Sequence, residues 1–112
     1  MSADRIRQLN DAFRKGERPE LGDIVITPGV RALVSPWPMG IAVVYDKVRM
    51  FEAFDNANDP HHEHDFGAFE HCDTKLFFKL DCYDKKMECG SENPADEKVT
   101  TRVLTIMLAH EY

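Results

Sequence analysis

The sequence predicts an α+β fold: a small antiparallel sheet of three to four strands with about three helices packed mainly on one face. Apolar residues recur at helical spacing in two segments of the N-terminal half and again near the C-terminus, whereas the segments between them alternate in polarity. The chain has 112 residues, of which 43% are hydrophobic and 30% are charged, as in globular proteins. We therefore expect a single α+β domain over residues 1–112.

The N-terminal half is expected to contain two helices and one strand. Helical spacing predicts a first helix over residues 3–15, which Gly16 ends. The β-branched residues 24–27 predict a short strand that stops at Pro28-Gly29. Apolar residues at helical spacing then predict a second helix over residues 39–54.

The C-terminal half is expected to contain three strands and a closing helix. Alternating polarity predicts strands over residues 64–71 and 76–83, joined by a tight turn at Cys72-Asp73. A short strand is expected at residues 87–89. Because Val99, Val103 and Ile106 keep helical spacing, a closing helix is expected from Pro94 to His110.

The negative charge of the chain is concentrated in one segment, residues 50–74, which contains seven carboxylates, four of the five histidines and no Lys or Arg. The other residues hold 13 acids and 14 bases, so the formal charge of −6 arises in this segment. Its carboxylates form the predicted acidic binding face: Glu52, Asp55, Asp59, Glu63, Asp65, Glu70 and Asp73. Such a face suits a cationic partner and argues against nucleic acid as a direct ligand.

The alternative is a small metal-binding module or metal-dependent enzyme, in which the histidine-rich loop His61–His64 holds a divalent metal. In an extended loop, His62 and His64 point to one side, and with a carboxylate such as Asp65 they could hold zinc. The spacing matches no zinc-protease motif, and His64 beside acidic residues is also typical of a solvated surface loop. No cofactor is expected under the main hypothesis.

The remaining side chains favour structural roles. The acidic neighbours of Cys72 and Cys82 raise a thiol pKa, which disfavours a nucleophilic role. The phenylalanines near the acidic segment are expected to fill the core, with Phe77 and Tyr83 on the second face of the sheet as an apolar patch rimmed by carboxylates. Three cysteines without CxxC spacing, and the lack of a signal peptide or apolar span, lead us to expect a cytoplasmic protein without membrane contact.

Several runs of the sequence resemble a bacterial family of short uncharacterised proteins that is common on plasmids and other mobile elements. The runs are Arg5–Arg14, Ile26–Val30, Asn58–Glu70, Phe77–Asp84 and Asn93–Tyr112, and the most specific parts are His64-Asp-Phe-Gly67 and the segment from Thr100 to Leu108. The resemblance brings no established activity and implies no catalytic residue. Within the histidine-rich loop it favours Glu63, His64 and Asp65 over His61 and His62 as functional residues.

The leading hypothesis is therefore a non-enzymatic acidic protein that docks a basic protein surface. Small acidic proteins of mobile elements resemble anti-CRISPR and antirestriction proteins, which act as nucleic-acid mimics. This association makes a CRISPR or restriction complex of the host the expected partner, because such a complex holds a positive groove for its nucleic acid. A homo-oligomer is a further possibility that the sequence leaves open.

Overall fold

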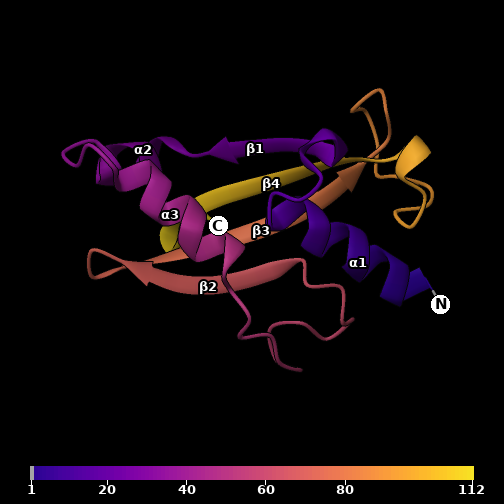
Figure 1. The fold of residues 1–112 in the computed structure, drawn as a ribbon, viewed down its shortest axis with the longest axis horizontal. Coiled ribbons are helices and arrows are strands. Elements are labelled where there is room, and N and C mark those ends of the chain that lie inside the picture. Colours follow the sequence, from indigo (N-terminus) through magenta and orange to yellow (C-terminus); the bar gives the residue numbers. More distant parts are fainter. Residues whose placement is uncertain (1) are drawn as a thin grey trace.

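The computed structural model describes residues 2–112, and residues 3–112 with their side chains. Within this range, three α-helices and a four-stranded sheet confirm the predicted α+β class (Figure 1). The helices are α1 (Ser2–Arg14), α2 (Pro28–Val34) and α3 (Gly40–Arg49), and the strands are β1 (Gly22–Ile26), β2 (Phe66–His71), β3 (Thr74–Tyr83) and β4 (Thr101–Leu108). No helix in residues 2–112 is both long and apolar enough to span a bilayer.

The strands are arranged in the order β1-β4-β3-β2, with β1 and β2 at the two edges. β4 pairs antiparallel with β3, and β3 pairs antiparallel with β2, whereas β1 runs parallel to β4. The sheet is thus mixed, whereas the sequence predicted a purely antiparallel one. Figure 1 shows α1 and α3 against one face of the sheet, with α2 at one end.

The hydrophobic core lies between this helical layer and the sheet. In β3 and β4, side chains that point toward the helices alternate with side chains that point to the second, open face. The buried residues of the core include Leu9, Phe13, Val30, Val44, Val48, Leu76, Phe78, Leu80, Leu104 and Ile106. Each such side chain contributes about 1.5–3 kcal/mol when it leaves water, so this layer is the main source of stability.

The predicted closing helix from Pro94 to His110 is wrong, because its central residues form strand β4. The same apolar residues fit both periods: Arg102, Leu104 and Ile106 are buried on the helical side, while Val103 and Thr105 are half-buried on the open face. Six of the eight residues 99–106 are β-branched, which favours an extended backbone over a helix. As a result β4, the last strand in the chain, occupies the middle of the sheet.

The short strand expected at residues 87–89 is also wrong. The amide of Met87 donates to the carbonyl of Asp84 at 3.0 Å, and Met87 has a φ of 60°, which is left-handed and not extended. In contrast, the tight turn at Cys72-Asp73 is confirmed. Both residues have positive φ (52° and 57°), as in a two-residue hairpin turn of type I′.

The predicted helices differ from the observed ones in two places. Pro28-Gly29, expected only to end a strand, begins helix α2, and the Thr27 hydroxyl caps it by accepting a hydrogen bond from the Val30 amide at 3.4 Å. The helix expected over residues 39–54 is the shorter α3, which ends at Arg49. The first helix matches its prediction, and Gly16 follows its end with a φ of 79°.

Candidate functional site

The acidic segment begins as a loop over residues 50–65 that hangs below α1 and α3 in Figure 1. A buried arginine, Arg14 of α1, determines where α3 stops and this loop starts. Its Nη1 donates to the carbonyl oxygens of Val48, Arg49 and Phe51 at 2.8, 3.2 and 3.0 Å. A guanidinium thus satisfies carbonyl groups that a helix C-terminus leaves without partners.

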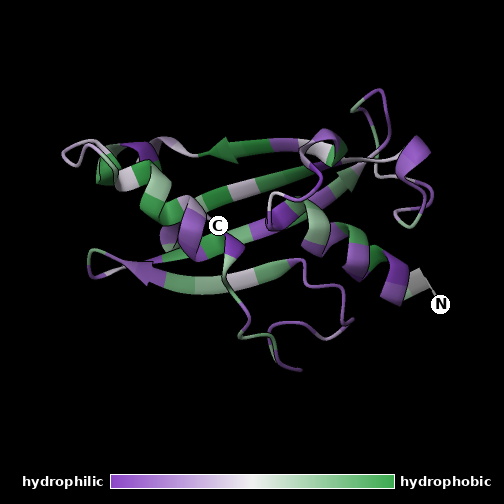
Figure 2. Ribbon diagram, in the orientation of Figure 1, coloured by the Kyte–Doolittle hydropathy of each residue, from purple (hydrophilic) through white to green (hydrophobic). Residues whose placement is uncertain are grey.

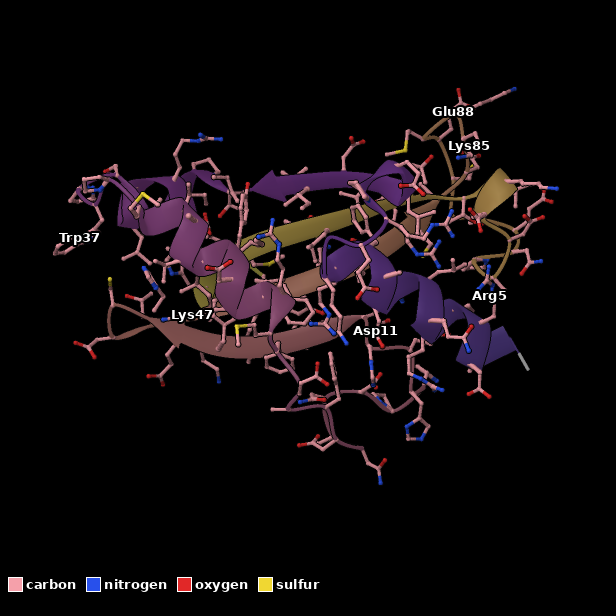
Figure 3. The ribbon with its side chains drawn as sticks, viewed as in Figure 1. Arg5, Asp11, Trp37, Lys47, Lys85 and Glu88 are labelled. Carbon is pink, nitrogen blue, oxygen red and sulfur yellow. The ribbon has the colours of Figure 1, made fainter. Side chains whose placement is uncertain are left out.

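His64, near the C-terminal end of the loop, contacts α1. Its Nδ1 lies 2.9 Å from Oδ1 and 3.1 Å from Oδ2 of Asp11. Its ring stacks on Phe54 with 3.9 Å between centroids and 5° between planes. Figure 3 shows Asp11 on the side of α1 that faces this loop. His64 therefore positions the loop and is less than a quarter exposed.

Two further polar residues hold the loop from inside. The buried Asp59 carboxylate accepts hydrogen bonds from the backbone amides of Glu63 (3.0 Å) and His64 (3.1 Å). The buried Asn10 donates to the Glu63 carbonyl at 2.9 Å and accepts from Arg102 Nε at 2.7 Å. Because the loop is tied to α1 and β4 in this way, the side chains that it presents are held in fixed positions.

The seven predicted carboxylates do not form one compact face. Asp59 is 2% exposed and faces inward. Asp73 lies in the turn after β2, whereas Asp65 immediately precedes β2, and a six-residue strand separates them by about 20 Å. Glu52 forms an exposed ion pair with Lys15 at 3.5 Å, a type of contact that contributes little. The charge is thus divided between the loop, with Glu52, Asp55, Glu63 and Asp65, and the strand and turn, with Glu70 and Asp73.

Beside the loop lies a hollow of about 510 Å³, which we call the Asp65 hollow. Side chains that line it include His61, Asp65, Phe66, Lys79, Asp81 and Tyr112. Next to it on the open face, the rings of Phe66, Phe77 and Tyr112 form a mutual cluster with centroids 4.9, 5.8 and 5.7 Å apart. Phe77 therefore lies on the second face of the sheet, as the sequence predicted.

Two carboxyl groups of the loop lie in an environment that disfavours their ionisation. The pKa of Asp65 is raised above its ordinary value, mainly by burial and further by the charges of Asp59 and Asp81. Burial, together with the charge of Asp65, likewise raises the pKa of Glu63. Within residues 2–112, Asp65 has no ion pair with a Lys or Arg, whereas Asp81 pairs with Lys79 at 3.2 Å. A cation that entered the hollow would relieve this strain.

A family model described as "protein of unknown function (DUF3768)" matches residues 26–111. The chain belongs to this family. The matched range contains the acidic segment and the lining of the Asp65 hollow except Tyr112, while α1, with its loop-holding Asn10, Asp11 and Arg14, lies outside it. No curated protein and no solved structure matches the chain.

His62 and His64, the histidines of the alternative metal site in this DUF3768 chain, do not lie on the extended loop that was expected. His64 is engaged by Asp11 and Asp59, with its Nε2 3.7 Å from Asp59 Oδ2. Both His62 and His64 have left-handed φ angles (58° and 57°), so the loop is not the extended segment on which the shared direction of their side chains was predicted. In the part of the chain that the structure describes, no three His, Cys, Asp or Glu side chains are grouped to hold a metal ion.

The cysteines are all unpaired thiols in residues 2–112. Cys72 and Cys89 are exposed, and Cys82 is half-buried in β3. Burial raises the pKa of the Cys82 thiol, which keeps it protonated at neutral pH. This agrees with the structural role that the sequence predicts for that residue.

Sequence reasoning missed the C-terminal contribution to the hollow. Tyr112 is 75% exposed and completes the aromatic cluster, and Glu111 fixes it in place. The Glu111 carboxylate accepts from the Leu108 amide (2.8 Å), the Thr27 hydroxyl (2.6 Å) and the Gly29 amide (3.1 Å), and these bonds lower its pKa. No sequence signal placed these residues there, because the segment was expected to end a helix.

Proposed function

We propose that this chain is a non-enzymatic binding protein that takes up a basic side chain of a partner protein in the Asp65 hollow. The observation that supports it best is the state of Asp65: a half-buried carboxylate without a Lys or Arg partner in residues 2–112, beside a hollow walled by aromatic rings. A partly buried carboxylate without a Lys or Arg partner is disfavoured in its charged form, so a cation that binds beside it would stabilise the site.

The lining of the hollow suits an arginine better than a simple ion. The planar guanidinium can bond Asp65 and Asp81 together, and its alkyl stem and charged face can lie against Phe66 and Tyr112. In the free protein Lys79 forms an ion pair with Asp81. When an arginine binds Asp81, the Lys79 side chain would have to turn toward solvent. Glu63 and the remaining loop carboxylates would attract and orient a basic surface at longer range.

The finer proposal is that the partner is a nucleic-acid-handling defence complex in the cytoplasm, such as a CRISPR or restriction complex. Support comes from the excess negative charge of residues 50–74 and from the resemblance to proteins of mobile elements. A complex that binds nucleic acid carries arginines arranged to meet phosphates, and carboxylates held on a fixed loop can compete for them.

The first experiment measures binding of a fluorescent arginine-rich peptide by anisotropy at low and high salt. We expect Asp65→Asn to weaken binding about fivefold or more, because one desolvated charge-assisted contact is lost. Asp73→Asn removes the same charge from the distant turn and should weaken binding less than about twofold. Equal losses in both variants would mean diffuse charge attraction and would refute the hollow as the site.

A second experiment addresses the partner. The chain is used as bait in a host lysate at low and high salt, with the Asp65→Asn variant as matched control. The proposal expects a nucleic-acid-binding protein that the wild type captures at low salt and that nuclease-treated lysate still yields. Capture that persists in the variant, or that depends on nucleic acid, would contradict it.

A further inference from the structure

The edge strand β1 has backbone groups that pair with no further strand in residues 2–112. The Thr27 amide donates to the Ile106 carbonyl at 3.1 Å, so the backbone of Thr27 faces β4. Since successive residues of a strand direct their amides and carbonyls to opposite sides, Asp23 and Val25 also face β4. The N–H and C=O groups of Gly22, Ile24 and Ile26 therefore point outward, where residues 2–112 place no further strand.

The second half of this edge presents apolar side chains on both faces of the sheet. Ile24 is 40% exposed on the helical face and Val25 is 45% exposed on the open face. Figure 2 shows the second half of β1 coloured as hydrophobic, and the strand Gly22-Asp-Ile-Val-Ile26 contains no Lys, Arg or Pro. Apart from the exposed Asp23, this strand has no Lys or Pro of the kind by which proteins prevent edge-to-edge pairing.

The opposite edge, β2, is protected in contrast. Lys47 of α3 donates from Nζ to the outward carbonyl of Glu70 at 2.9 Å and lies 3.1 Å from His71 Nδ1. Figure 3 shows Lys47 between α3 and β2. A lysine on the edge, with the exposed Glu70 beside it, prevents a further strand from pairing there. The two edges of one sheet thus differ in what they can accept.

We propose that β1 pairs with β1 of a second copy of this chain, antiparallel about a two-fold axis at Ile24, to form a continuous eight-stranded sheet. In this register Ile24 faces its own equivalent, and Gly22 faces Ile26 of the partner subunit, so all the outward groups can bond. Asp23 then lies opposite Val25 of the partner subunit, which avoids a pair of like charges.

The distribution of charge favours a second copy as the occupant. The acidic segment ends in β2 and its turn, at the edge of the sheet farthest from β1. Pairing through β1 therefore keeps the two acidic segments at the outer ends, where their mutual repulsion is smallest and largely screened by salt. The Asp65 hollow stays accessible on both subunits, so the dimer would present two binding sites.

The test measures molar mass in solution by sedimentation velocity over about a hundredfold range of concentration. We expect a dimer that dissociates on dilution, and we expect Val25→Lys to give a monomer. Val99→Lys is the matched control, because Val99 is 41% exposed but lies outside the sheet, and it should remain dimeric. A wild type that is monomeric throughout, or a Val25→Lys variant that stays dimeric, would overturn the proposal.

The register is tested by cross-linking in a parent in which Cys72, Cys82 and Cys89 are replaced by Ser. Ile24→Cys should give a cross-linked dimer with a short thiol-reactive linker, whereas Val99→Cys should give none. Equal yields would mean random collision and would refute the β1 interface. Circular dichroism of each variant establishes that it is folded, and Asp65→Asn should leave the dimer intact, so this test fails or succeeds independently of the proposed function.

Discussion

His64 Nδ1 lies 2.9 Å from Asp11 Oδ1, although 53 residues separate the two in the chain. This contact joins the acidic loop to α1, and Asp11 also pairs with the buried Arg14 at 3.1 Å. The chain Arg14–Asp11–His64 thus links the end of α3 to the residue that precedes Asp65. The arrangement implies that the loop and the N-terminal helix act as one unit.

The contribution of Arg14 to the stability of the fold can be measured by substitution. Arg14→Met keeps much of the apolar stem but removes the donors to three carbonyl groups, so we expect a loss of about 2–4 kcal/mol in the free energy of unfolding. Urea denaturation measures it. The matched control is Arg31→Met in α2, an exposed arginine, which should change stability by less than about 0.5 kcal/mol. Similar losses in both variants would contradict the capping role.

Asp59 is predicted to act in folding and not in binding. Asp59→Ala leaves the amides of Glu63 and His64 without their acceptor, and we expect a loss of about 1–3 kcal/mol in urea denaturation. Glu52→Ala, which breaks only an exposed ion pair, should cost less than about 1 kcal/mol. If Asp59→Ala weakened peptide binding without loss of stability, the inward role of this carboxylate would be wrong.

The raised pKa of Asp65 makes a prediction with a definite sign. A carboxyl group whose folded pKa lies above its unfolded value binds its proton more tightly in the folded state, so ionisation destabilises the fold as pH rises. Asp65→Asn should therefore be more stable than the wild type at neutral pH, and the gain should vanish as pH falls below the ordinary carboxyl range. Urea denaturation at several pH values measures the difference.

Glu97 supplies a control of opposite sign for that experiment. Hydrogen bonds from Arg18 lower the pKa of Glu97, so its charge stabilises the fold above the ordinary pKa and this contribution is lost as pH falls. Glu97→Gln should therefore be less stable than the wild type at neutral pH and equal to it in acid. The same sign for both variants would mean that the environment of Asp65 is not as described.

Gly22 is predicted to be irreplaceable because β1 approaches β4 closely there. A Cβ at this position would lie 1.9 Å from the Arg102 carbonyl oxygen, so Gly22→Ala must displace the strand and should cost about 3 kcal/mol or more. Gly90→Ala is the control, since its Cβ would lie 4.0 Å from the nearest atom, the Cys82 carbonyl oxygen. We expect it to change the thermal midpoint little, whereas an equally mild effect of Gly22→Ala would refute the close approach.

The sequence predicted correctly those elements whose hydrophobic pattern fits only one secondary structure, either helix or strand. Residues 3–15 fit only a helix, and the alternating residues of β3 fit only a strand, so both predictions are confirmed. Residues 99–108 fit either period, and the helical spacing of Val99, Val103 and Ile106 outweighed the β-branched composition in the prediction. Mistaking this strand for a helix also concealed the parallel pairing with β1.

The sequence indicated where the acidic loop lies in the chain but not the geometry of its side chains. The excess of carboxylates located the loop and Asp65, yet nothing in the order of residues showed that Asp59 turns inward to the amides of Glu63 and His64. Likewise, the contribution of Tyr112 depends on Glu111 reaching the start of α2 from the opposite end of the chain. Contacts of this kind arise from tertiary structure, which local patterns do not encode.

The position of β4 has a consequence for synthesis on the ribosome. Because the last strand inserts between β1 and β3, the sheet has no continuous centre until residues 101–108 have emerged from the exit tunnel. Until then β1 has no neighbouring strand, and the nascent polypeptide exposes apolar surface to chaperones and proteases. A product that ends before residue 101 would consequently leave β1 without a neighbouring strand.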